Sequence, residues 1–147
     1  MKKLLSTTVL LALVTITTSL SAQLKELHTP KIEHLSSIIE WSEWKGSLKV
    51  KDGSHYFIEF RNPRYQYIKD RQLIHIGDLK DYKELREAIL SIVGTKEKRT
   101  FEGRHHTIYV KPRGKKQIKL GIYQEYGDDL YTHYFSARQI KKLLPNI

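Results

Sequence analysis

The strongest constraint on the fold is a pair of alternating segments separated by Asp52-Gly53. Period-two alternation of apolar side chains is typical of half-buried strands, and Asp-Gly favours a two-residue hairpin turn because glycine accepts a positive φ. Asn62-Pro63 ends the second segment, since proline cannot donate to a strand ladder. The sequence therefore predicts an antiparallel hairpin, whose apolar positions are Leu48, Val50, Tyr56, Ile58 and Phe60.

Further strands are predicted in both halves of the chain. We expect them over residues 65–76, 106–111, 117–123 and 130–135, and we expect the charged segment 95–103 to be a linker. Residues 30–45 are ambiguous, because Leu35, Ile38 and Ile39 fit helical spacing, whereas a strand over 37–44 would alternate poorly. We favour the helix slightly and keep the strand as the alternative.

Two other helices have clearer boundaries. An apolar stripe at helical spacing from residue 79 to residue 93 predicts a helix that begins at Asp78 or Asp81 and ends at Gly94. Ser136 and Gln139 have the spacing of a Ser-x-x-Gln capping box, which predicts a short final helix.

Together these elements predict an α+β fold with an antiparallel sheet of about six strands and helices on one face. The two halves share a βββα outline, which is compatible with a structural pseudo-repeat, although chance is a serious rival explanation. The outline is similar in layout to that of whirly-type single-strand nucleic-acid binders. No residue motif carries this resemblance, so it implies little about function.

Residues 1–22 are expected to be a secretory signal peptide rather than part of the fold. Lys2 and Lys3 precede an apolar run, and cleavage after Ser21 or Ala22 would follow it. An uncleaved membrane anchor is the alternative. We therefore expect residues 23–147 to form a single domain in the periplasm or outside the cell. The chain has no cysteine, which excludes disulfides and thiolate chemistry.

The excess positive charge is concentrated in one short segment. The whole chain has a formal net charge of +10, and residues 96–119 contain nine basic residues against Glu97 and Glu102. Such a concentration attracts anionic partners, although a solvated hairpin tip is an equally simple explanation. The predicted partner-binding residues are Lys96, Lys98, Arg99, Arg104, Lys111, Arg113, Lys115, Lys116 and Lys119. We expect the acidic turn after residue 123 to lie at the opposite end of the sheet.

The sequence contains no nucleotide-binding loop, nucleophile elbow or zinc-protease motif, and we expect no cofactor and no metal site. One enzyme hypothesis remains, a metal-independent nuclease that uses acid–base side chains. Its candidate residues are Glu59, His75, Arg104, His106 and His133.

The favoured interpretation is a small exported, non-enzymatic binding protein that engages an anionic protein or envelope polymer through the basic hairpin. The second is a nucleic-acid-binding protein in which Tyr109 and Tyr123 stack beside the basic tip. The nuclease is the third. None of them identifies the partner.

Overall fold

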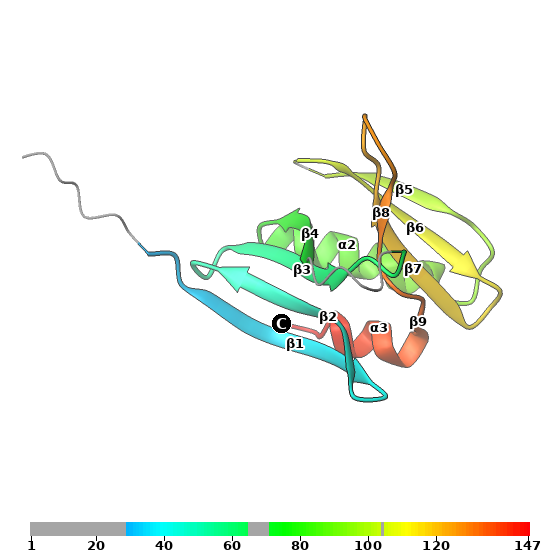
Figure 1. Ribbon diagram of the computed structural model, residues 1–147, viewed down its shortest axis with the longest axis horizontal. Coiled ribbons are helices and arrows are strands. Elements are labelled where there is room, and N and C mark those ends of the chain that lie inside the picture. The colour runs from blue at the N-terminus through cyan, green and yellow to red at the C-terminus, as the bar shows by residue number, and fades with distance from the viewer. Residues whose placement is uncertain (1–28, 65–70, 104) are drawn as a thin grey trace, which may run out of the picture.

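The computed structural model of the chain describes residues 29–64, 71–103 and 105–147, which form two antiparallel sheets and two helices (Figure 1). The first sheet has the order β1-β2-β3-β4. Its strands are β1 (Ile32–Glu40), β2 (Glu43–Lys51), β3 (His55–Arg61) and β4 (Arg71–Gly77). The predicted hairpin is confirmed, because β2 pairs antiparallel with β3 and both Asp52 and Gly53 have positive φ.

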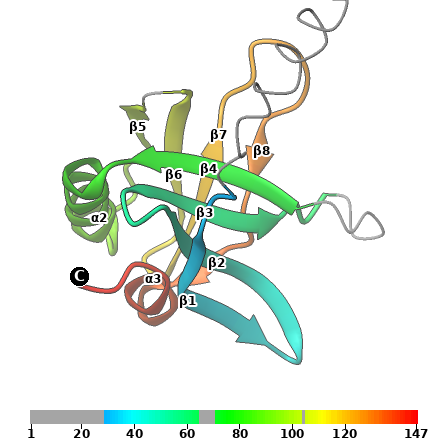
Figure 2. The same ribbon diagram turned by 90° about the vertical axis from the view of Figure 1, so that its left-hand side faces the viewer.

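The second sheet has the order β5-β6-β7-β8, and a further strand, β9, also pairs with β7. All pairs in it are antiparallel. Its strands are β5 (Arg99–Glu102), β6 (Thr107–Arg113), β7 (Gln117–Ile122), β8 (Leu130–Tyr131) and β9 (Phe135–Ser136). As Figure 2 shows, the strands of this sheet run across the direction of the strands in the first sheet.

Both helices begin where the sequence predicts. Helix α2 (Leu79–Ile92) follows Asp78, whose side chain accepts hydrogen bonds from two N–H groups of the first turn, while Asp81 accepts from the N–H of Asp78. Helix α3 (Ala137–Leu143) follows Ser136, which forms the same reciprocal arrangement with Gln139. Each box satisfies N–H groups that the helix cannot satisfy itself.

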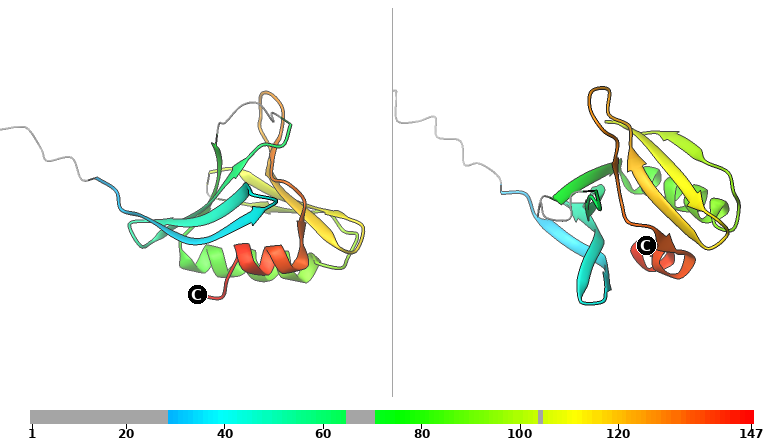
Figure 3. Two further views of the ribbon diagram at one scale, coloured as in Figure 1. Left: turned by 60° about the horizontal axis from the view of Figure 1, so that its bottom comes forward. Right: turned by 45° about the vertical axis from the view of Figure 1, so that its right-hand side comes forward.

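The helices lie side by side on the same side of the two sheets (Figure 3). They and the inward faces of both sheets contribute to one cluster of buried apolar side chains. Tyr82 of α2 stacks on Tyr56 of β3 with ring centroids 5.1 Å apart, and its hydroxyl donates to the carbonyl of Pro145. Burial raises the pKa of Tyr82 to about 12. Within the described residues, neither helix is long and apolar enough to cross a membrane.

The α+β class with antiparallel pairing is confirmed, but the single sheet of six strands is wrong. The strands form two sheets, of four and five strands, and the pseudo-repeat is not confirmed. The predicted strand 130–135 is divided into β8 and β9. The segment expected to be a linker contains β5, and most of its residues are exposed because it lies at an edge of its sheet.

The helix predicted in residues 30–45 is also wrong, since these residues form β1 and the start of β2. Trp41 and Ser42, both with positive φ, make the turn between the two strands. Only Ile38 of β1 is fully buried, so the apolar residues at helical spacing do not form one buried stripe. β1 is a strand because its backbone pairs with β2 along the whole length of β2. The predicted start of the third strand, residues 65–70, lies outside the described residues.

Candidate functional site

The outward face of the second sheet collects tyrosine and basic side chains. Successive residues of a strand point to opposite faces, so Ile108 and Val110 enter the core while Tyr109 and Lys111 face away from it. Gly121 stands opposite Tyr109 and leaves room for its ring, because a Cβ atom there would lie only 2.3 Å from the ring. We call this surface the aromatic-basic face, and it consists of Lys98, Tyr109, Lys111, Arg113, Lys119, Tyr123, Tyr131 and Tyr134.

Two lysines stand directly opposite each other at the centre of this face. Lys111 of β6 is the cross-strand partner of Lys119 of β7, and such like-charge pairs destabilise a sheet. Burial lowers the pKa of Lys119, and the charge of Lys111 lowers it further, while Asp129 acts in the opposite direction. The fold therefore places two cations opposite each other and removes part of the water around Lys119.

Tyrosine rings hold three basic side chains of this face in place. The Lys119 ammonium lies 3.8 Å from the centroid of the Tyr131 ring, and Arg113 lies 5.2 Å from that of Tyr134. The Lys98 ammonium lies 4.9 Å from the centroid of Tyr123 and also donates to its hydroxyl group. Cations over ring faces are attracted by the ring quadrupole, so the basic side chains are positioned before any partner binds.

A hollow of about 480 Å³ lies on this face. Lys98, Lys111 and Lys119 line it together with Asp128 and Asp129 of the β7–β8 connection. Arg64, from the end of the first sheet, also lines the hollow, and its guanidinium binds the Asp128 carboxylate at 2.6 Å. The hollow is thus lined by four basic and two acidic side chains.

The predicted arrangement of the turns is confirmed, because the β6–β7 and β7–β8 connections leave β7 at opposite ends (Figure 1). The predicted separation of charge is only partial. Asp128 and Asp129 of the acidic turn line the same hollow as Lys111 and Lys119, which lie in the middle of their strands. Lys115 and Lys116 lie at the basic tip, away from this hollow.

The structure brings together only some of the predicted partner-binding residues. Lys98, Lys111, Arg113 and Lys119 share the aromatic-basic face. Arg99 pairs with the inward-facing Val110, so it lies on the other face, where it binds Glu97 at 3.2 Å.

Two further predicted residues lie before and after β5. Lys96 is exposed in the connection before β5, and Arg104 lies outside the described residues. The sequence reasoning missed Tyr131, Tyr134 and Arg64, because only the curvature of the chain after β7 and the approach of the first sheet place them here.

The nuclease candidates that the structure describes are not assembled into one site, and Arg104 lies outside the described residues. His75 lies near His105 and His106, with ring centroids 5.7 and 6.0 Å away. Glu59 instead binds Lys49 and Arg71, and the charges that act on His133 belong to the β1–β2 hairpin and to Arg61 of β3. In the described ranges, no group of three His, Asp or Glu side chains is placed to hold a metal ion.

The histidine cluster predicts that acid destabilises the protein. Burial lowers the pKa of both His75 and His106, and the neighbouring histidines lower each pKa further. The unfolded chain therefore binds more protons, so stability should be full above about pH 6.5 and should fall as the pH drops below it. Urea unfolding at about pH 7 and about pH 5 measures this change.

The His106→Gln variant should lose less stability over the same pH interval, since it removes one of the imidazoles whose pKa is lowered. His55→Gln, at an exposed position in β3, is the matched control. An identical loss in wild type and the His106 variant would contradict the explanation.

Comparison with known proteins gives no family assignment. No protein-family model, no curated protein and no solved structure matches the chain.

Proposed function

We propose that the protein is an exported, non-enzymatic binding module that engages an anionic partner through the aromatic-basic face. The observation that carries the proposal is the pairing of Lys111 with Lys119 at the centre of this face. A phosphate, sulfate or carboxylate group between the two ammonium groups would relieve their repulsion and form charge-assisted hydrogen bonds with both. Export is proposed from the signal-peptide pattern of residues 1–22.

The arrangement of the rings supports recognition of charged groups. Tyr109 is only 4% exposed, so its ring supports the face and Lys98 rather than offering a surface to a ligand. The cations Lys98, Lys111, Lys119 and Arg113 follow the sheet from the hollow towards the β6–β7 turn. A row of this kind fits a polymer with repeated negative charges better than a single ion.

The test is the binding of heparin to wild type as the salt concentration rises. We expect binding at low salt whose affinity falls steeply with salt, because it depends on the release of counterions. Reversal of the three lysines of the hollow, in K98E/K111E/K119E, should weaken binding by at least about tenfold. The control K80E/K83E/K142E changes the net charge equally, on the two helices. Equal losses in both variants would show that only net charge matters.

A milder variant separates binding from folding. Lys111→Gln together with Lys119→Gln should raise the melting temperature, because it removes a repulsive pair, and should weaken heparin binding at the same time. Opposite signs for the two effects are characteristic of a site that binds at the expense of stability. A variant that is less stable and binds normally would contradict the proposal.

A second candidate partner is single-stranded nucleic acid, and the exposure of Tyr123 favours it. This ring is 39% exposed beside Lys98, so a base can reach one of its surfaces. If bases stack there, Tyr123→Leu should cost about 1–3 kcal/mol in binding an oligonucleotide and little in binding heparin. Similar effects on both probes would leave nucleic acid as one polyanion among others.

A further inference from the structure

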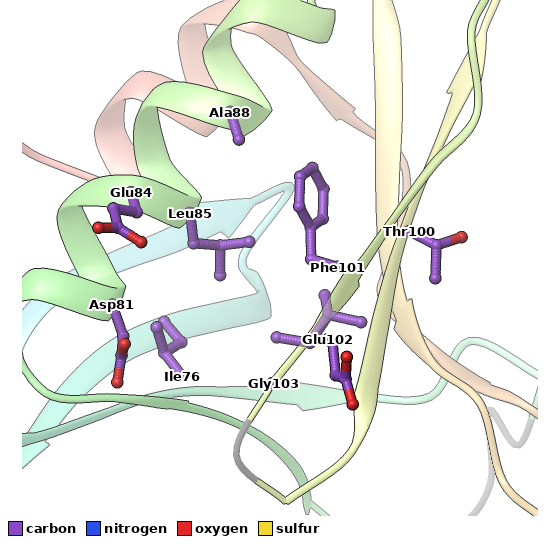
Figure 4. Close-up of a pocket in the computed structure, with 10 residues that line it drawn as sticks. Ile76, Asp81, Glu84, Leu85, Ala88, Thr100, Phe101, Glu102 and Gly103 are labelled. Atoms are coloured by element: carbon purple, nitrogen blue, oxygen red, sulfur yellow. The ribbon is translucent and has the colours of Figure 1, made fainter.

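A groove on the other side of the second sheet lies between α2 and β5, with a volume of about 730 Å³ (Figure 4). Ile76, Leu85, Ala88 and Phe101 give it apolar walls. Figure 4 shows the Phe101 ring directed towards α2, across the groove from Leu85 and Ala88. The volume is within the range of sites that hold small ligands or short peptides.

The wall formed by β5 is the free backbone edge of that strand. Residues 100–103 all line the groove, although alternate side chains of a strand point to opposite faces. In the part of the chain that the structure describes, β5 pairs with β6 alone. Consecutive residues line the groove because the edge itself, with its hydrogen-bonding groups, faces it.

The register identifies which backbone groups are directed into the groove. The N–H of Gly103 donates to the carbonyl of His106 at 3.0 Å. The pair Phe101–Ile108 lies two residues further along the ladder, so it is a hydrogen-bonded pair of the same kind. Because hydrogen-bonded and non-hydrogen-bonded pairs alternate in an antiparallel ladder, the backbone groups of Thr100 and Glu102 point away from β6. The next ladder agrees with this register. Thr107 is the partner of Glu102, and its carbonyl points away from β5 and accepts a hydrogen bond from the N–H of Tyr123, just after β7.

We propose that this groove binds an extended peptide segment of a partner protein, which adds to β5 as an antiparallel strand. Addition of a strand to an open edge is a recurrent mode of peptide recognition. The four residues of β5 span roughly 13 Å at the usual rise of a strand. The main-chain groups of Thr100 and Glu102 would supply the hydrogen bonds.

The walls specify the chemistry of the segment. A residue opposite Phe101 would point towards Leu85 and Ala88, which requires an apolar side chain. Residues opposite Thr100 and Glu102 would point to the outer face. Glu102 of β5 points to the same outer face and favours lysine or arginine at these positions. The segment should therefore alternate apolar and basic residues, which distinguishes it from the anionic partner of the aromatic-basic face.

A capped hexapeptide of alternating lysine and valine is a direct probe. Titration into 15N-labelled protein should shift amide resonances of β5 and α2 and should protect the amides of Thr100 and Glu102 from exchange. Two N-methylated isomers sharpen the test, because the lysine N–H groups would face β5 and the valine N–H groups would face away. Methylation of the lysine amides should abolish binding, and methylation of the valine amides should preserve it.

Two charge variants provide a matched comparison. Glu102→Lys should weaken peptide binding at least severalfold, whereas Glu87→Lys makes the same charge change at an exposed position of α2 outside the groove. Circular dichroism confirms folding of both variants. Equal binding of the two methylated isomers, resonance shifts elsewhere, or no binding at millimolar peptide would overturn the proposal. Heparin binding is measured separately, so failure here leaves the proposed function intact.

Discussion

Replacement of Glu59 by alanine is expected to lower the free energy of unfolding by about 3 kcal/mol. The Glu59 carboxylate binds the Lys49 ammonium at 2.6 Å on the outward face of the first sheet. These two side chains are only 11% and 10% exposed, and Arg71 contacts the same carboxylate oxygen at 3.3 Å. Loss of the carboxylate would leave the Lys49 charge largely out of water with no partner at that position, which is the costly way to break a buried pair.

A double variant tests this explanation. Lys49→Met with Glu59→Leu removes both charges and keeps much of the volume, so its stability should lie within about 1 kcal/mol of wild type. Glu43→Ala breaks ion pairs whose carboxylate is half-exposed and should cost less than about 1 kcal/mol. Urea unfolding at neutral pH measures all three variants. A double variant as unstable as Glu59→Ala would show that packing, not charge, is responsible.

The same carboxylate makes a contribution that depends on pH. Burial alone would raise the pKa of Glu59, but the hydrogen bond and charge of Lys49, together with Arg71, outweigh it and hold the pKa below its usual value. The stabilisation is therefore full above about pH 4.3 and is lost as the pH falls through the lowered value. This loss occurs at lower pH than the loss caused by the histidines.

The second large effect is expected for Phe135→Ala, which should cost about 3–5 kcal/mol. Phe135 is 1% exposed, and it belongs to β9, where it pairs with Ile118 of the second sheet. Its ring also reaches the first sheet, because a Cβ atom built on Gly46 would lie 3.7 Å from the tip of the ring. Removal of the ring would leave a cavity between the two sheets.

When its unfolding is followed by tryptophan fluorescence, the Phe135→Ala variant also tests whether residues 23–147 form the predicted single domain. Trp44 belongs to β2 and Trp41 to the β1–β2 turn, so the tryptophan signal reports the first sheet alone. If the sheets share one core, Phe135→Ala should shift the fluorescence transition and the circular-dichroism transition equally. Phe135→Leu should produce a smaller shift in the same direction. An unchanged fluorescence transition would mean that the sheets unfold independently.

The elements that local sequence predicts well are those whose signals do not depend on distant residues. Three such signals are each complete within a few residues: the Asp52-Gly53 turn and the capping boxes that begin at Asp78 and at Ser136. Their backbone requirements are met by the residues themselves, and the structure confirms all three. In contrast, β1 and β5 contain few buried side chains and are strands because a neighbour pairs with them.

The candidate site also has one part that the sequence predicts and another that depends on the tertiary structure. The concentration of basic residues between Lys96 and Lys119 is a property of the sequence. The alternation of β6 and β7 then selects Lys111 and Lys119 for one face, and the hairpin register places them opposite each other. The sequence also indicates that Tyr109 is close to basic residues, but it does not show that the ring is buried.

By itself, the sequence determined the class of fold, the helix starts, the β2–β3 hairpin and the location of the excess charge, because each depends on neighbouring residues. Only the tertiary structure decided that the strands divide into two sheets, that Tyr131 and Tyr134 stand beside Lys119, and that Arg64 binds Asp128. It also decided that the free edge of β5 faces α2 across a groove lined by both apolar and acidic side chains. These features join residues far apart in the chain, and the burial of apolar surface common to both sheets brings them together.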